Sequence, residues 1–358
     1  MKMQENGWES LRSGITLDQI QKAAKMSGYP LQTEVATLLN SMGFDVQDEW
    51  SYLDQNSAQP RTIDIRANIQ LRNLPSEESR IRPHLTLIIE CKKSDMPYVF
   101  FRNNPRIALE FPFIFGLSNK WVQVETDDDR STWKFSVSEV LGMDDHSFVT
   151  NALCSSIFSK CVRRGKEVEL SGSEAYSSTV FPLVSAVQHF ERMCTPPKTA
   201  FWFDARLTIC LAVLDAPMIS IDPTAGEGEA SPVPWVRVLR NEPSDKPRIL
   251  AEQGKVWAID FVHKDYLGDY LKNHAIPYAE MFAEKACYHD QVLGSMQGFV
   301  KGLGAGRWDV IKNEVEPLSI LIGPSSRIPV GSLANLNLRA KMMIKEMNLN
   351  SSRRKRSR

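Results

Sequence analysis

The stretch Leu85-Thr86-Leu87-Ile88-Ile89-Glu90-Cys91-Lys92-Lys93 begins as an apolar run and ends in one acid and two lysines. An apolar run rich in branched residues is typical of a strand that is buried on both faces. Because side chains alternate along a strand, we expect Glu90 and Lys92 on one side and Cys91 on the other. Desolvating a carboxylate and an ammonium is costly unless they pair or bind a ligand. We therefore look for further acids on neighbouring elements that could lie beside this strand end.

The elements before this strand form a simple series. Apolar residues repeat at helical spacing over residues 31–42, which predicts a helix that stops at Gly43. Residues 44–52 and 62–69 alternate between apolar and polar, which predicts two strands. A helix followed by three consecutive strands, the last at 85–93, predicts a helix packed on a three-stranded antiparallel meander.

Three acids occur in chain order along these elements. Glu34 lies in the first turn of the helix, Asp64 on the polar side of the second strand, and Glu90 at the end of the third. A glutamate in a first turn is also explained by the helix dipole alone, and that reading stays open for Glu34. If the second and third strands are neighbours, Asp64 faces Glu90 at one end of the sheet, although sequence does not specify the register.

Converging carboxylates form a hard-oxygen site that suits Mg²⁺ or Mn²⁺. Their repulsion raises a pKa unless a cation is present, so the pair needs a metal to stay ionised. Such a metal polarises a phosphodiester and lowers the pKa of a bound water. Lys92 lies on the same face as Glu90, where it can stabilise the developing charge or orient the water. The two carboxylates, the metal and the lysine would therefore each have a role in phosphodiester hydrolysis.

These segments, GYPLQTEVATLLNSMGF, RTIDIRA and LTLIIECKK, resemble the PD-(D/E)xK, or restriction-endonuclease-like, nuclease superfamily. The signature is a helix glutamate, an aspartate near a strand start and Glu-x-Lys on the next apolar strand. The resemblance covers residues 28–95. It implies a core with a central mixed sheet flanked by helices, and it implies that this core continues with a helix and a further strand. Residues 181–193 and 207–214 are the candidates for these two elements.

The resemblance also implies roles for the matching residues. Asp64 and Glu90 would bind Mg²⁺ or Mn²⁺ together with the backbone carbonyl of Cys91, Lys92 would be the catalytic lysine, and Glu34 would be the helix acid near the metal. The chain departs from the motif at Ile63, where many members have proline. Gln32 lies in the same helical turn as Glu34 and competes with it for the helix position.

The expected fold class is α/β (α+β mixed), with a restriction-endonuclease-like core, a large insertion and a helical C-terminal extension. The expected organisation is an N-terminal helical segment at 1–27, a nuclease-like domain at 28–290 with its core in 28–95 and 180–265 and an insertion at 96–179, a helical extension at 291–350, and a basic disordered tail at 351–358. Further expected elements are a helix at 145–163, a hairpin of 235–239 and 256–262 at a sheet edge, and a helix over 265–287 interrupted at Pro277.

Composition excludes several other classes of protein. The 358 residues include 43 basic and 43 acidic side chains, so total charge does not argue for nucleic-acid binding. The six cysteines lack C-x2-C spacing and the six histidines lack H-x3-H spacing, which disfavours zinc sites. The Gly-rich stretch at 301–306 lacks the features of a P-loop, and the acids at 127–129 fit a solvated turn. No G-x-S-x-G elbow is present.

Neither a secretory signal nor a membrane segment is visible, so we expect a cytoplasmic protein with reduced thiols. The first hypothesis is a Mg²⁺-dependent DNA endonuclease. The second is a catalytically inactive nuclease-like fold that acts as a DNA-binding or protein-assembly module. Expected phosphate contacts are Lys93, Arg66 and Arg102, with Arg237 and Arg240 on the later hairpin. Double-strand cleavage would suit a homodimer, and a partner protein would have to supply specificity or motor activity.

Overall fold

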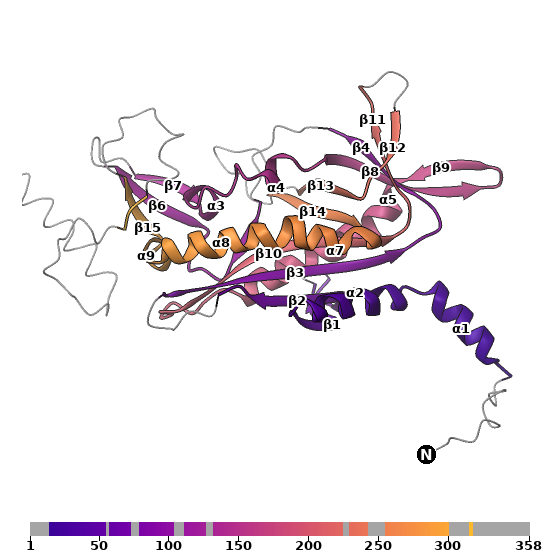
Figure 1. Ribbon diagram of the computed structural model, residues 1–358, viewed down its shortest axis with the longest axis horizontal. Helices are drawn as coiled ribbons and strands as arrows, with labels where there is room; N and C mark the ends of the chain where they lie inside the picture. The colour runs from indigo at the N-terminus through magenta and orange to yellow at the C-terminus, as the bar shows by residue number, and fades with distance from the viewer. Residues whose placement is uncertain are drawn as a thin grey trace, which may run out of the picture.

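A computed structural model describes residues 14–54, 57–72, 79–103, 111–126, 132–224, 229–242, 255–300 and 315–317. These residues form a mixed α/β structure built on a 12-stranded sheet, with a second sheet of three strands at one end (Figure 1). The expected α/β class is confirmed at this level. The expected helical extension at 291–350, the Gly-rich stretch at 301–306 and the basic tail at 351–358 lie wholly or largely outside the described residues, as do the acids at 127–129.

The strand β3 (Ile81–Lys93) lies near the middle of the large sheet. It pairs antiparallel with β2 (Pro60–Gln70), which pairs antiparallel with β1 (Asp45–Leu53), so the predicted meander is confirmed. On its other side β3 pairs in parallel with β10 (Phe203–Asp215) from one end to the other. Its apolar residues 85 and 87–89 are fully buried. The composition of the apolar run therefore predicted its environment correctly.

The remaining strands extend the sheet beyond β10. In order, they are β14 (Lys255–His263), β13 (Trp235–Glu242), β8 (Cys154–Arg164), β4 (Tyr98–Arg102), β11 (Met218–Asp222) and β12 (Glu229–Pro232), with β5 (Phe113–Phe115) paired to β10 and β9 (Glu167–Ser171) paired to β8. The second sheet contains β15 (Gln297–Val300), β6 (Trp121–Thr126) and β7 (Thr132–Ser136). The segment expected as an insertion thus contributes β4, β5, β8 and β9 to the main sheet.

Helices cover the sheet and connect its strands. They are α1 (Leu17–Met26), α2 (Tyr29–Ser41), α3 (Val137–Val140), α4 (Ser147–Thr150), α5 (Gly172–Ala175), the π-helix η1 (Tyr176–Val180), α6 (Phe181–Met193), the 3-10 helix η2 (Lys264–Tyr266), α7 (Leu267–Tyr270), the π-helix η3 (Leu271–Ala275), α8 (Ile276–Tyr288) and α9 (Asp290–Ser295). Both α2 and α6 pack against β1, β2 and β3, and α8 runs along β3 (Figure 1). The helix α6 has the predicted bounds.

Local sequence explains the position of α2. Pro30 lies in its first turn, where a missing N–H costs nothing. Leu31, Val35 and Leu39 repeat at helical spacing and are buried. Gly43 follows the helix with φ +88°, a left-handed conformation that glycine adopts without strain. The chain can therefore turn directly from α2 into β1.

Two of the later predictions are wrong in part or in whole. The helix expected over 145–163 consists only of α4, after which β8 pairs with β4 and β13. Pairing with strands far away in the sequence outweighs the local helical pattern. The β13–β14 pair is antiparallel as expected, but it lies inside the sheet between β10 and β8 and not at an edge. Pro277 falls in the first turn of α8, directly after the π-helix η3, so the interruption is a π-helical stretch.

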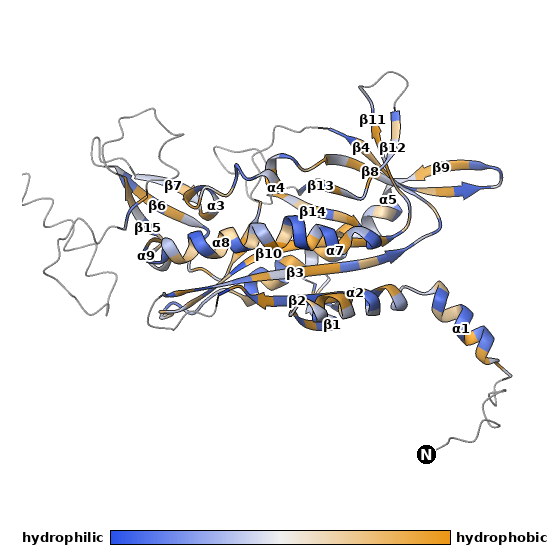
Figure 2. Cartoon of the chain, viewed as in Figure 1, coloured by the Kyte–Doolittle hydropathy of each residue, from blue (hydrophilic) through white to orange (hydrophobic). Residues whose placement is uncertain are grey.

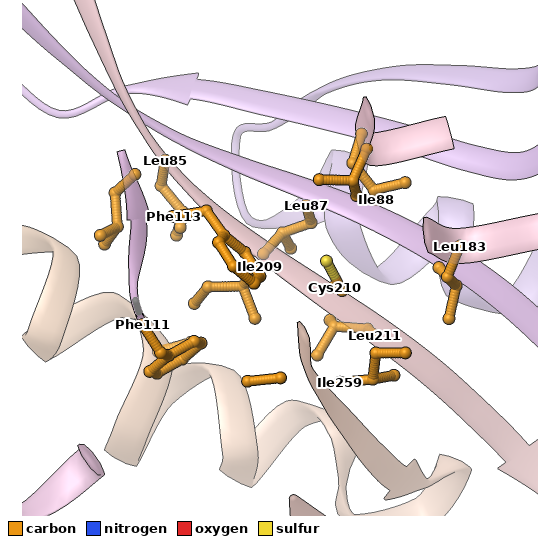
Figure 3. Close-up of a cluster of buried hydrophobic side chains, with 14 of the residues drawn as sticks. Leu85, Leu87, Ile88, Phe111, Phe113, Leu183, Ile209, Cys210, Leu211 and Ile259 are labelled. Atoms are coloured by element: carbon orange, nitrogen blue, oxygen red, sulfur yellow. The ribbon is translucent and has the colours of Figure 1, made fainter. Parts of the chain in front are cut away.

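The main core is built around β3 and β10. Leu85 and Leu87 on β3 pack near Ile209 and Leu211 on β10, and Phe113 on β5 closes the cluster (Figure 3). Colouring by hydropathy shows β3 apolar along its middle and polar at its carboxyl end (Figure 2). The polar end of β3 is therefore anchored by a large apolar core.

A fully buried ion pair joins β13 to β14. Arg237 and Asp260 are 0% and 1% exposed, with Nε–Oδ1 at 2.7 Å and Nη2–Oδ2 at 2.8 Å. The Tyr270 hydroxyl donates to Asp260 at 2.6 Å, and Arg237 Nη1 donates to the carbonyl of Phe148 at 2.8 Å. Phe111 stacks on the guanidinium at 4.0 Å. Arg237 therefore cannot contact a phosphate, which corrects the expectation for this residue.

Other sequence-based expectations concern redox state and membranes. All six cysteines are free thiols. Among the described residues, no helix has the length and apolar character required to span a membrane.

Replacing Asp260 with alanine would leave the Arg237 charge buried without a partner. We expect Asp260→Ala to lower the free energy of unfolding by about 3–5 kcal/mol. The matched control is Glu169→Ala, which removes the partner of Arg164 in an exposed pair and should change stability by less than about 1 kcal/mol. Urea unfolding measures both, and equal losses would contradict the structural role of the buried pair.

Candidate active site

Strand register brings Asp64 and Glu90 to the same end of the sheet. Ile65 on β2 lies opposite Ile89 on β3, and the two strands are antiparallel. Asp64 precedes Ile65 and Glu90 follows Ile89. The two acids therefore lie opposite each other, one position beyond the Ile65–Ile89 pair. The backbone N–H of Cys91 donates to Asp64 Oδ2 at 2.6 Å, which ties the aspartate to β3. The structure thus brings together the two acids that the sequence placed on separate strands.

Lys92 forms an ion pair with Glu90, since Lys92 Nζ donates to Glu90 Oε1. The glutamate side chain is 8% exposed and the lysine side chain 27%. Burial raises the pKa of Glu90 to about 7, and the negative charge of Asp64 adds to this rise while Lys92 opposes it. The predicted alternation, with Glu90 and Lys92 on one side, agrees with this contact.

The charges at this strand end are not fully compensated. Burial is the main reason why the pKa of Asp64 is also raised, despite the Cys91 N–H and the Lys92 charge. Burial disfavours the charged form of Lys92, but Glu90 and Asp64 outweigh it and keep the lysine pKa above its usual value. Within the described part of the chain, only one oxygen of each carboxylate accepts a hydrogen bond, Asp64 Oδ2 and Glu90 Oε1. Two carboxylates therefore share one cation and retain free acceptor oxygens.

The helix α2 presents Gln32 to this group, not Glu34. Gln32 is buried, and its Nε2 donates to the backbone carbonyl of Asp64 at 2.9 Å. Glu34 is exposed and lines a surface groove with Tyr29 and Thr37. Two residues along a helix correspond to a rotation of about 200°, so the two side chains point in different directions. Of the two residues that competed for the helix position, the structure brings only Gln32 to the site.

One acid near the site was missed in the sequence. Glu49 lies on β1 between Asp48 and Trp50, which pair with the residues on either side of Asp64. Its charge raises the pKa values of both Asp64 and Glu90, and its backbone has φ +48°. A non-glycine residue in this left-handed region is unusual and often marks a functional constraint. No local pattern specifies the register of β1 on β2, so nothing in the sequence marks Glu49 as a neighbour of Asp64.

Two tyrosines border the acids and the lysine. The Tyr52 hydroxyl donates to the Pro182 carbonyl in the first turn of α6 at 3.2 Å, and burial raises the pKa of Tyr52 to about 12. Tyr98 on β4 lies within electrostatic range of Lys92 and hydrogen-bonds Thr179 in the π-helix η1. The start of α6 and the π-helix therefore form one wall beside the strand end, and π-helical turns are frequent at functional sites.

The donor set is compatible with a divalent cation but is not a complete protein cage. No group of three or more His, Cys, Asp or Glu residues placed to hold a metal occurs among the described residues. Asp64 and Glu90 supply carboxylate oxygens, the ligands that Mg²⁺ and Mn²⁺ prefer, and Mg²⁺ commonly uses one or two carboxylates with waters and substrate. The uncompensated negative charge of the pair favours a cation at this place. The residues present therefore fit such a metal.

The expected phosphate-binding residues are not gathered at the site. Lys93 is next to it and donates from Nζ to the Lys25 carbonyl at 2.7 Å. Arg102 donates to the Ser220 hydroxyl at 2.6 Å, between β4 and β11. Arg66 lies two residues beyond Asp64 on the same side of β2, and its guanidinium lies over the Trp50 ring at 5.3 Å. Arg240 is exposed and stacks on Tyr176 at 4.4 Å. Of these residues, only Lys93 directly adjoins the Glu90–Lys92 pair in sequence.

Comparison with known proteins gives no match: no family model, no curated protein and no solved structure matches the chain. The geometry of the residues themselves is therefore the basis on which we infer a function.

The raised pKa of Glu90 makes a prediction about stability in the absence of metal. Between pH 4.5, the ordinary pKa of the group, and about pH 7, the folded protein retains a proton that the unfolded chain releases. Rising pH therefore favours unfolding in this range, by on the order of 3 kcal/mol from this group. We expect Glu90→Gln to remove this pH-dependent loss.

The measurement is chemical unfolding at several pH values with a chelator present. The control is Glu34→Gln, a change at an exposed glutamate that should leave the pH dependence of the wild type intact. Identical pH profiles for wild type and Glu90→Gln would show that Glu90 is not buried beside Asp64.

Proposed function

We propose that the chain is a metal-dependent nuclease of the PD-(D/E)xK type that hydrolyses phosphodiester bonds in DNA. The convergence of Asp64 with Glu90 and Lys92 at one end of two adjacent strands carries this proposal. The order of elements supports it: α2, the β1–β2–β3 meander, then α6 and the parallel strand β10. This order is the one that a restriction-endonuclease-like core implies.

Asp64 and Glu90 would hold the metal, each with an oxygen that accepts no other hydrogen bond in the described part of the chain. When bound, Mg²⁺ or Mn²⁺ supplies Lewis-acid polarisation of a phosphate oxygen and a water of lowered pKa. The Cys91 N–H and the Gln32 amide fix the side chain and the backbone of Asp64, which orients that ligand.

Lys92 would stabilise negative charge that develops on the phosphate. Its ammonium is held by Glu90 on the same side of β3, and its pKa is raised, so it stays protonated at neutral pH. A preorganised cation next to the reacting group lowers the barrier without reorganisation during the reaction. Lys92 thus acts as an electrostatic group or orients the water, and a role as a general base is disfavoured.

A DNA-binding or assembly module is the second candidate function. The helix α1 favours it, because α1 buries no residue although Leu17, Ile20 and Met26 are 46%, 42% and 67% exposed. An exposed apolar helix is suited to contact with another protein. In this case the acids at the strand end would be structural. A homodimer or a separate partner protein would fit the same surface.

Cleavage assays separate the two candidates. We expect the wild type to cut plasmid or branched DNA with Mg²⁺ or Mn²⁺, and Asp64→Ala, Glu90→Ala and Lys92→Ala each to lower the rate by roughly 10²-fold or more. The control is Glu34→Ala, which changes an exposed acid and should retain activity. Equal cleavage by all variants would contradict the assignment.

Metal binding gives an independent readout. We expect Mg²⁺ or Mn²⁺ to raise the melting temperature of the wild type, because a ligand that binds only the folded state stabilises it. Asp64→Asn should abolish the rise. An unchanged melting temperature, combined with tight DNA or protein binding and no cleavage, would favour the binding module.

A further inference from the structure

A second polar pocket lies along the same face of β2, β3 and β10, and it extends from Arg66 toward the amino-terminal end of β3. It has a volume of about 450 Å³, and arginines from three adjacent strands line it: Arg66 on β2, Arg82 on β3 and Arg206 on β10. Arg82 is eight residues from Glu90 along β3, which corresponds to about 26 Å, whereas Arg66 is two residues from Asp64 on the same side of β2, which corresponds to about 7 Å. The pocket therefore begins next to the carboxylate pair but includes neither acid. Its volume is within the usual range of small-ligand sites, roughly 300–1,000 Å³.

The charge of Arg66 is poorly compensated by the protein. Its guanidinium lies over Trp50 at 5.3 Å and Phe190 at 5.8 Å, and no carboxylate within the described residues forms an ion pair with it. Burial lowers the pKa of Arg66, and the positive charge of Arg206 lowers it further, while Asp45 opposes with a smaller effect. An anion between the two guanidinium groups would relieve this repulsion.

Arg206 is positioned to share such an anion. Its Nη1 donates to Asn68 Oδ1 at 2.7 Å, a neutral partner, and its Nη2 lies 3.5 Å from Asp204 Oδ2. Asp204 is already engaged, because Arg82 Nε lies 2.7 Å and His84 Nε2 3.7 Å from its Oδ1, and these neighbours hold the pKa of Asp204 below its usual value. Of the two acids that line the pocket, Asp45 and Asp204, the second is therefore compensated mainly by Arg82.

The same pocket has aromatic and apolar walls. Trp202 is 39% exposed and lines it together with Phe190, Met193 and the Pro196–Pro197 turn. Exposed aromatic faces stack on nucleobases, and paired arginines bind phosphate oxygens in a planar, bidentate manner. A concave pocket that offers both features suits a single phosphorylated nucleoside better than an extended nucleic-acid backbone.

We propose that this pocket binds a 5′-mononucleotide, with its phosphate between Arg66 and Arg206 and its base against Trp202. Neither Asp64 nor Glu90 lines this pocket, so mononucleotide binding and phosphodiester cleavage can be tested separately. It gives the chain a small-molecule ligand in addition to any nucleic acid.

Isothermal titration calorimetry of the full chain, with a chelator present, tests the site. The probes are adenosine 5′-monophosphate, inorganic phosphate, adenosine and a short single-stranded oligonucleotide without terminal phosphates. We expect the mononucleotide to bind at least about tenfold more tightly than phosphate or adenosine, because it uses both walls of the pocket. Arg66→Gln and Arg206→Gln should each weaken its binding about tenfold or more, as expected for loss of a charge-assisted contact.

Two further variants complete the design. Trp202→Ala, at a partly exposed position, should lower the affinity for the mononucleotide to that for phosphate. Arg164→Gln removes an equal charge from the exposed β8–β9 hairpin and should change nothing. If Arg66→Gln does not fold, Arg66→Lys and Trp202→Ala carry the test. No mononucleotide binding, binding that is insensitive to Arg66, Arg206 and Trp202, or binding of the oligonucleotide alone would overturn the proposal.

Discussion

The position of β3 between two long partners is the constraint on which the candidate site depends. The strand is antiparallel to β2 on one side and parallel to β10 on the other. A shift of one residue in either pairing would turn every side chain of β3 to the opposite face. Residues 85–91 are buried on both faces of the sheet, so such a shift would move Glu90 and Lys92 to the face that Cys91 occupies and away from Asp64. The pairing of β3 with β2 and β10 thus sets Glu90 beside Asp64.

The protein holds this charged strand end at an energetic cost. Glu90 is nearly buried, and its raised pKa reports how unfavourable a second negative charge is beside Asp64. Lys92 compensates in part, and the Cys91 N–H stabilises Asp64. Local instability of this kind is common at functional sites and needs a stable framework. The apolar centre of β3 and β10 and the buried Arg237–Asp260 pair provide that framework.

Features that depend on neighbouring residues could be predicted from the sequence. The alternation that puts Glu90 and Lys92 on one side of β3 is local, and so are the apolar stripe of α2 and the bounds of α6. The order of helix and strands followed from the same patterns. These features depend only on the period of each element and on turn residues such as Gly43.

Features that depend on distant pairing could not be predicted. The apolar stripe of α2 leaves both Gln32 and Glu34 beside it, and only the angle at which the helix packs on β2 decides which one reaches Asp64. Glu49 approaches the acids because β1 pairs with β2 in one particular register. The segment 154–164 is a strand because β4 and β13 are its neighbours. In each case tertiary contacts decide between options that are locally equivalent.

The most direct test of the central claim is a crystal structure of the chain grown with Mn²⁺, with the ion located by its anomalous scattering. We predict a single strong peak at Asp64 and Glu90, with the Lys92 ammonium nearby and no peak at Glu34. A peak elsewhere, or carboxylates that remain without a metal at saturating Mn²⁺, would contradict the claim that this strand end is a metal site.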